Sequence, residues 1–407
     1  MKEDRGLSDE IAGDEDDIFD VSFLKAVIES AMNRGTEVFI VQLPEGLRRI
    51  TYRIKAVADE LFNQTKERRK NHLLFFDASP CFGACHLPSI PSFLSTEETT
   101  RNLLVIQFGH LPVPEIYCCP PVTSSSEPCM TILSCKEDRN IPVVFVPVYC
   151  KINLPGSGVV KQIRDIVEDR EFLLLASYPY TEILEPLSLL LRTAELKPVI
   201  STGHARIYTA GQVLGCNFSA IGCSSMRDEN RVVENRVNEK KASKNVLVIS
   251  DGMFHPLGAS LTGVSCKVWW IDPQSWAITD MAPERDRFLR KRFGKIEYCR
   301  EKGFKKCGIL LSTAIGQERI SLAKKISIQA EQHGFSPVIF TDNLFDFTTL
   351  SYMPVNFFVS TACPRIAIDD AERIKKPVLT PIEFEILCGI GQWDDYVLDQ
   401  ILEGGQR

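Results

Sequence analysis

The chain has 407 residues, more than one hydrophobic core usually supports, so two or three domains are expected. Apolar residues make up 44% and charged residues 25%, as in soluble globular proteins, and no apolar run reaches the roughly 18 residues that span a bilayer. The net charge of −6 argues against direct nucleic-acid binding, which depends on clustered Lys and Arg. We therefore expect a cytoplasmic protein with no membrane segment and no nucleic-acid partner.

The first twenty residues are rich in Asp and Glu and predict a disordered acidic arm, residues 1–20. After it, short β-branched apolar runs alternate with longer amphipathic stretches, a pattern typical of parallel sheets with crossover helices. The expected strands are residues 38–43, 73–77, 103–108 and 143–148; then 172–176, 198–202, 246–250 and 268–272; and finally 308–312, 337–341, 357–360 and 377–380. The expected helices are residues 47–62, 184–196 and 317–333.

Three blocks of strands predict an α/β fold with three similar domains, each holding a roughly four-stranded parallel sheet and flanking helices. The domains are expected at residues 21–155, 156–276 and 277–407. In open parallel sheets, ligands gather at the carboxyl ends of the strands. Three such ends that face a common centre would bring residues from all three domains into one site.

Three cysteines close turns of small residues: Cys85, Cys216 and Cys363. Cys363 directly follows an expected strand, and Cys85 follows one after a short turn. The chain has 14 cysteines, and in a cytosolic protein these are not expected to form a disulfide framework. Iron–sulfur clusters prefer thiolate ligands, and three ligands instead of four leave one iron open to a substrate. We therefore predict that the three cysteines hold one catalytic iron–sulfur cluster at the centre of the domains.

Other cysteines offer weaker sites. Cys81 lies four residues before Cys85, but position 88 is Pro88, so the Cys-x3-Cys-x2-Cys motif of radical enzymes is absent. Cys81 is an alternative ligand, although Gly83 and Ala84 favour Cys85 because small residues let the backbone approach an inorganic core. A second group has gaps that do not fit the Cys-x2-4-Cys pairs of zinc sites. It consists of Cys118, Cys119, Cys129 and Cys135.

Several longer motifs support a family resemblance from about residue 38 to residue 389. They are QLPEGL at 42–47, GAC at 83–85, RIYTAGQVLGC at 206–216, DGMFHPLG at 251–258 and TACPRIA at 361–367. With these motifs the chain resembles the archaeal members of the 2-(3-amino-3-carboxypropyl)histidine synthase family, which starts diphthamide formation on translation elongation factor 2. One local departure is His86, which follows Cys85 where the family usually has an acidic residue.

The resemblance implies a cofactor, a reaction and partners. Cys85, Cys216 and Cys363 would bind a 4Fe-4S cluster, with S-adenosyl-L-methionine at the fourth iron. The enzyme would transfer the 3-amino-3-carboxypropyl group of S-adenosyl-L-methionine to a histidine of translation elongation factor 2 by a noncanonical radical mechanism. A homodimer and an unidentified electron donor are also expected from the resemblance.

Six residues in or near the motifs are candidates for cofactor binding, either because they follow an expected strand or because they belong to the motif at 206–216. For two of them, His255 and Asp272, ordinary turn chemistry is the competing explanation. The candidates are Gln42, Glu45, Gly211, Gln212, His255 and Asp272. Two other functions stay open: a dehydratase like quinolinate synthase, and a non-catalytic accessory subunit that binds the elongation factor or passes electrons.

Overall fold

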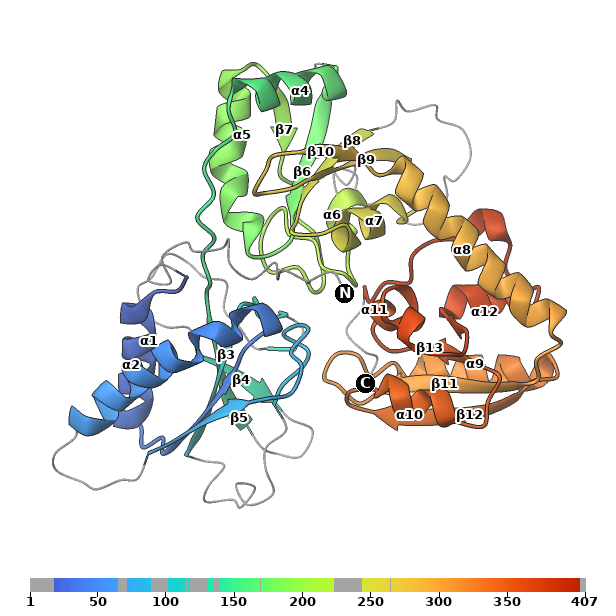
Figure 1. Cartoon of the computed structure of the whole chain (residues 1–407), viewed down its shortest axis with the longest axis horizontal. Coiled ribbons are helices and arrows are strands. Elements are labelled where there is room, and N and C mark those ends of the chain that lie inside the picture. Colours follow the sequence, from blue (N-terminus) through green and yellow to red (C-terminus); the bar gives the residue numbers. More distant parts are fainter. Residues whose placement is uncertain are drawn as a thin grey trace, which may run out of the picture. The chain divides into compact units, whose positions relative to one another are not determined.

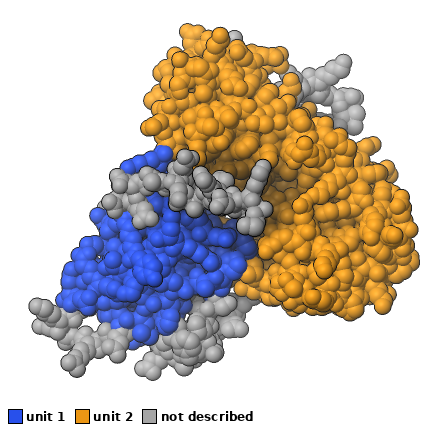
Figure 2. All heavy atoms as spheres, viewed as in Figure 1, with its two compact units in different colours: residues 1–112, 117–151 blue, residues 113–116, 152–407 orange. Residues whose placement is uncertain are grey.

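The computed structural model of the chain describes residues 18–64, 72–88, 102–114, 116–117, 130–134, 140–168, 170–222, 244–263 and 265–402. The chain divides into two compact units (Figure 2), unit 1 with residues 1–112 and 117–151, and unit 2 with residues 113–116 and 152–407. Residues 1–17 of the expected acidic arm lie outside the described residues. The domain boundaries expected after residues 155 and 276 stay a prediction.

Unit 1 is built around one five-stranded sheet. Its elements are α1 (Val21–Asn33), β1 (Val38–Gln42), the 3-10 helix η2 (Glu45–Ile50), α2 (Thr51–Gln64), β2 (Leu73–Asp77), β3 (Leu103–Phe108), β4 (Met130–Ser134) and β5 (Asn140–Val146). The strand order is β2-β1-β3-β5-β4, parallel except for the antiparallel edge strand β4. Strands β1 and β3 are buried throughout, as expected for parallel strands covered on both faces. Helices α1 and α2 lie side by side next to the sheet (Figure 1).

The first sheet of unit 2 also has five strands. Its elements are α4 (Ser157–Val167), β6 (Glu171–Ala176), the 3-10 helix η4 (Tyr180–Ile183), α5 (Leu184–Thr193), β7 (Lys197–Val199), α6 (Ser219–Gly222), β8 (Lys244–Ile249), α7 (Phe254–Ser260), β9 (Cys266–Ile271) and β10 (Ile278–Asp280). The order is β10-β9-β8-β6-β7, parallel except for β10, which is antiparallel to β9. Alternate residues of β6 and β8 therefore point to opposite faces of this sheet.

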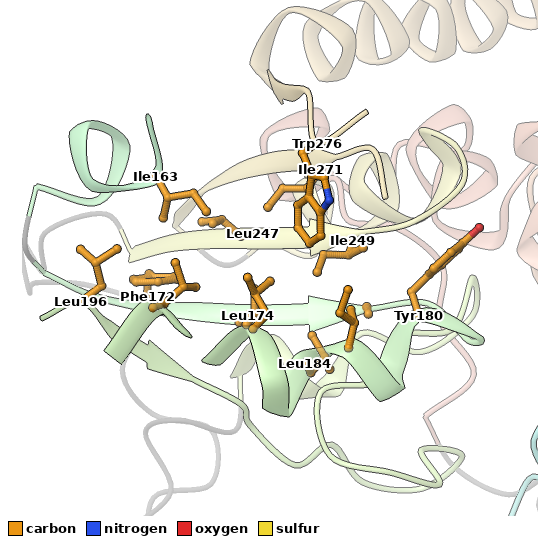
Figure 3. Packing of buried hydrophobic residues seen from close by; sticks show 14 of the residues in the cluster. Ile163, Phe172, Leu174, Tyr180, Leu184, Leu196, Leu247, Ile249, Ile271 and Trp276 are labelled. Carbon is orange, nitrogen blue, oxygen red and sulfur yellow. The ribbon is translucent and has the colours of Figure 1, made fainter. Parts of the chain in front are cut away.

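Both faces of that sheet are covered by helices. On one face, Phe172 and Leu174 of β6 and Leu247 of β8 pack against Ile163 of α4 and Leu184 of α5 (Figure 3). The alternate residues of β6 and β8 pack on the other face of the sheet, against α6, α7 and the start of α8 (Ala282–Glu301). This double coverage explains why these strands are continuous apolar runs in the sequence.

The second sheet of unit 2 has four parallel strands in the order β12-β11-β13-β14. Its elements are α8 (Ala282–Glu301), β11 (Lys306–Ser312), α9 (Ile320–Gln332), β12 (Ser336–Asp342), α10 (Phe347–Tyr352), β13 (Phe357–Ser360), α11 (Pro364–Ile368), the 3-10 helix η6 (Asp370–Arg373), β14 (Val378–Leu379), α12 (Pro381–Leu387) and the 3-10 helix η7 (Trp393–Asp395). One face packs against α8, α9 and α12 and the other against α10 and α11.

The predicted α/β fold class is confirmed: the described residues form three mainly parallel sheets with flanking helices. The antiparallel edge strands β4 and β10 were not expected from the sequence. No helix in the described ranges is long and apolar enough to cross a membrane.

Candidate metal centre

In unit 1, polar side chains meet at the carboxyl ends of three neighbouring strands. Gln42 is in register with Asp77 on one side and with Gln107 on the other. The Gln42 amide nitrogen donates to Asp77 Oδ2 at 3.1 Å, and Gln42 Oε1 accepts from Gln107 Nε2 at 3.0 Å. Gln42 and Gln107 are both buried. The three side chains therefore form a fixed polar row under the loop that carries Cys85.

The side chains of Gln107 and Tyr117 hold this loop by contacts with its backbone carbonyl groups. Gln107 Nε2 lies 3.3 Å from the carbonyl oxygens of Gly83 and His86, which flank Cys85 on both sides. The buried Tyr117 hydroxyl donates to the Ala84 carbonyl. The backbone on either side of Cys85 is therefore fixed, while the Cys85 side chain is half-buried.

The two cysteines of this loop differ in their surroundings. Cys81 is buried and its sulfur lies 3.3 Å from Gln107 Nε2. Burial raises the pKa of the Cys81 thiol to about 11, although the hydrogen bond from Gln107 lowers it. A metal ligand must be a thiolate, so these surroundings favour Cys85 over Cys81 as the ligand.

In unit 2, Cys216 lies in the loop between β7 and α6. Gly211 has a φ of +75° and is buried, and a Cβ atom there would lie 2.3 Å from Leu184 Cδ1, so its place in the motif has a packing reason. The buried Gln212 side chain accepts from the backbone N–H groups of Tyr208 and Thr209. Both residues therefore shape the loop that presents Cys216, and a contact of either with a cofactor stays a prediction.

A buried arginine contacts the Cys216 sulfur directly. Arg206 Nη1 donates to Cys216 Sγ at 3.4 Å, and the other terminal nitrogen donates to the carbonyl of Gly316 in the loop after β11. The Arg206 side chain is only 3% exposed. The guanidinium thus joins the Cys216 sulfur to a strand end of the second sheet of unit 2.

The segment that follows η7 also holds the Cys216 loop, through hydrogen bonds. Ile401 donates its backbone N–H to the Cys216 carbonyl at 2.8 Å, and Phe218 donates its backbone N–H to Gln400 Oε1 at 2.9 Å. Between these residues and η7, Asp399 accepts two hydrogen bonds of 2.7 Å from Arg319. The Cys216 loop is therefore held by a segment nearly 200 residues later in the chain.

Cys363 lies directly between β13 and α11. The preceding Thr361 binds the Leu310 carbonyl through both its backbone N–H and its hydroxyl, which ties the strand end to β11. Cys363 is the N-cap residue of α11, and Pro364 starts the helix. The cysteine is half-buried, as Cys85 and Cys216 are.

Phe254 and Arg365 connect the surroundings of Cys216 and Cys363. A Cβ atom at Gly215 would lie 2.2 Å from the Phe254 ring, so the loop of Cys216 rests on that ring. The Arg365 guanidinium, two residues after Cys363, lies 5.7 Å from the same ring centroid. The loop that carries Cys216 and the helix that begins after Cys363 therefore both contact Phe254.

The predicted candidate His255 lies next to Phe254 in α7. Burial lowers the pKa of His255 to about 4; Asp251 acts in the opposite direction, and Arg365 lowers the pKa further. The imidazole is therefore neutral near pH 7, able to donate and accept a hydrogen bond. His255 thus lies in the helix whose Phe254 contacts the segments of Cys216 and Cys363, and a contact of His255 with a cofactor stays a prediction.

The glycine before Cys216 gives a direct test of the packing on Phe254. Gly215→Ala should lower the free energy of unfolding by about 1–3 kcal/mol, because its Cβ would clash with the Phe254 ring. Gly252→Ala is the matched control in the motif that contains Phe254, since nothing lies within 4 Å of its added Cβ. Urea unfolding of both variants measures the difference, and equal midpoints would show that the loop does not rest on Phe254.

The other polar candidates lie elsewhere. Glu45 is exposed at the start of η2 in unit 1. Asp272 accepts from the Gln274 backbone N–H at 2.9 Å and from the Ser275 hydroxyl at 3.0 Å, in the turn between β9 and β10. Asp272 therefore stabilises a hairpin turn, and a ligand contact at either residue stays a prediction.

Cys85 belongs to unit 1, whereas Cys216 and Cys363 belong to unit 2. Within neither unit do three described His, Cys, Asp or Glu side chains gather closely enough to hold a metal ion. The second cysteine group, Cys118, Cys119, Cys129 and Cys135, lies outside the residues whose side chains are described.

Sequence reasoning did not select the residues that hold the cysteine loops: Gln107, Tyr117, Arg206, Phe254 and Gln400. A lone polar residue at the end of an apolar run, such as Gln107 after residues 103–106, is the one local signal that could have indicated such a role. Arg206 and Phe254 lie inside the motifs at 206–216 and 251–258, but nothing in those motifs shows what they contact.

The chain is thus an α/β protein that presents half-buried cysteines on loops fixed by hydrogen bonds. The family model for diphthamide synthesis proteins matches residues 43–397. The chain is 30% identical to 2-(3-amino-3-carboxypropyl)histidine synthase from Pyrococcus horikoshii, over 94% of this chain and 93% of the relative. The enzyme of the same name from Methanocaldococcus jannaschii is 22% identical over 87% of this chain and 85% of the relative.

The fold is also similar to a crystal structure of Dph2 from Pyrococcus horikoshii with a 4Fe-4S cluster. The TM-score is 0.72 at 27% identity, and the match covers 94% of this chain and 95% of the other. The chain belongs to the diphthamide synthesis protein family. The relatives that match nearly its whole length are enzymes, named as synthases.

Proposed function

We propose that this chain transfers the 3-amino-3-carboxypropyl group of S-adenosyl-L-methionine to a histidine of translation elongation factor 2, the first step of diphthamide formation. The proposal is supported by the contact of Gly215 and Arg365, next to Cys216 and Cys363, with the same Phe254 ring. It occurs in a chain that matches named synthases over most of its length. The shared contact of the two cysteine segments favours a metal-dependent enzyme over an accessory subunit.

The residues present fit a 4Fe-4S cluster held by Cys85, Cys216 and Cys363. All three are half-buried cysteines in loops outside the strands, where a bulky inorganic group can reach them. Five other cysteines, Cys81, Cys266, Cys299, Cys307 and Cys388, have thiol pKa values raised by burial to about 11 or 12. Those five are poor thiolate donors, which supports the ligand set that the sequence predicts.

The protein residues have separate roles in this proposal. When bound, the cluster supplies one electron to the sulfonium of S-adenosyl-L-methionine, so that the bond to the aminocarboxypropyl carbon breaks and methylthioadenosine leaves. Gln107 and Tyr117 keep the Cys85 loop in place. His255 is neutral and exchanges hydrogen bonds with the substrate without adding charge. By fixing the Cys85 loop and orienting the substrate, these residues together would select which carbon–sulfur bond of the substrate breaks.

The products and the acceptor test the proposal together. Anaerobically reconstituted protein, incubated with S-adenosyl-L-methionine, reductant and elongation factor 2, should yield methylthioadenosine. Mass spectrometry should find one aminocarboxypropyl group on a single histidine of the factor. The Cys363→Ala protein is the control that should give neither product.

Other products would contradict this function. 5′-Deoxyadenosine with an unmodified factor would indicate radical cleavage on another substrate. A reconstituted cluster with no nucleoside product would favour a dehydratase like quinolinate synthase, and no cluster at all would favour an accessory subunit.

The partners of the reaction follow from the same proposal. We propose that two copies of the chain pair as a homodimer and that a separate donor protein supplies the electron. Light scattering at working concentration tests the pairing, which a monomeric mass with full activity would contradict.

A further inference from the structure

The contact between Arg206 and Cys216 has a chemical meaning beyond loop structure. A guanidinium stays protonated even when buried, and this one is only 3% exposed. Its Nη1 is 3.4 Å from Cys216 Sγ, within hydrogen-bond reach of a sulfur acceptor. The structure therefore places a fixed positive charge against the sulfur of one predicted cluster ligand.

The geometry holds that charge in one orientation. The second terminal nitrogen of Arg206 donates to the Gly316 carbonyl. Gly316 has a φ of +74°, a backbone conformation that favours glycine, and a Cβ atom there would lie 2.4 Å from the same nitrogen and displace the guanidinium. Because a guanidinium is a rigid fork, fixing one nitrogen on Gly316 fixes the other on Cys216.

We propose that Arg206 is a positioning residue that raises the reduction potential of the cluster, an inference that rests on the proposed function. Reduction adds an electron to the cluster and its sulfurs. A positive hydrogen-bond donor beside one sulfur stabilises that added charge, and hydrogen bonds to the sulfurs are among the protein's means of setting cluster potentials.

Redox titration of the anaerobically reconstituted full chain, followed by electron paramagnetic resonance, tests this role. Arg206→Gln removes the charge and should lower the ratio of reduced to oxidised cluster at a fixed potential at least tenfold. That change corresponds to a midpoint shift of about 59 mV to more negative values for a one-electron couple. Arg206→Lys keeps the charge and should stay closer to the wild-type midpoint than Arg206→Gln does.

Gln400→Leu is the matched structural control. It removes the acceptor of the Phe218 N–H and loosens the same loop without touching the Cys216 sulfur. It should lower the unfolding temperature and leave the midpoint potential unchanged.

Two failures can be told apart. If the wild-type protein takes up no cluster, the proposed function is wrong. If wild type, Arg206→Lys and Arg206→Gln all bind a cluster with the same midpoint potential, this inference is overturned while the proposed function stands. If Arg206→Gln holds its cluster too briefly for titration, the uncharged variant Arg206→Met is titrated in its place. A midpoint lowered by about 59 mV supports the role of the charge, and an unchanged midpoint contradicts it.

Discussion

Cys85→Ala, Cys216→Ala and Cys363→Ala will each lose most of the bound iron and all transfer activity. A cluster with one open iron needs its three thiolates, so removing any one leaves an iron without its ligand. Iron content, the absorption spectrum after anaerobic reconstitution and methylthioadenosine release measure the effect.

Two matched cysteines serve as controls for this set. Cys81 lies in the same loop as Cys85, and burial raises the pKa of its thiol to about 11, so Cys81→Ala is the first control. Cys299→Ala removes a buried cysteine of α8 whose thiol pKa is about 12. Both controls should keep the cluster. A full cluster in Cys85→Ala combined with its loss in Cys81→Ala would assign the ligand to Cys81 instead.

Breaking the buried ion pair between Arg292 and Glu383 will cost about 3–5 kcal/mol of folding free energy, because the remaining charge is left unpaired in the core. The two side chains are 1% and 0% exposed, and Arg292 Nε donates to Glu383 Oε1 at 2.6 Å. Arg292 also donates to the carbonyls of Ala367 at 2.7 Å and Val378 at 2.8 Å. It thereby braces the end of α11, the helix that begins after Cys363.

Urea unfolding of three variants tests this pair. Arg292→Met and Glu383→Leu should each be strongly destabilised, and the double variant Arg292→Met/Glu383→Leu should lose less than the sum of the two single losses. The control is Lys325→Gln, which breaks an exposed pair with Glu385 of the same helix α12 and should cost no more than about 1 kcal/mol. Equal losses in Arg292→Met and Lys325→Gln would show that the buried pair does not stabilise the fold.

The predictable part of the fold consists of strands buried on both faces. The run at residues 103–108 matches β3, and the run at 357–360 matches β13, because a continuous apolar run is the signature of a covered parallel strand. The edge strands β4 and β10 and the helix α8 were missed. Helix α8 buries few residues, among them Arg292, which a sequence pattern assigns to the surface.

The candidate site also has residues that the sequence could select and roles that it could not distinguish. The three cysteines, His255 and Asp272 could be selected because turn residues after an apolar run are visible locally. The turn role of Asp272 could not be separated from a ligand role, because the antiparallel strand β10 that completes its hairpin is only three residues long.

The sequence by itself determined the α/β class and the family and predicted the three-cysteine set, because periodicity, small-residue turns and long motifs are properties of neighbouring residues. Only the tertiary structure decided what surrounds each cysteine. Arg206 meets the carbonyl of a glycine 110 residues later, and the backbone of Cys216 binds that of Ile401. Such contacts depend on how loops of different sheets meet, and no local pattern encodes that meeting. The charge beside the Cys216 sulfur is therefore a property of the fold.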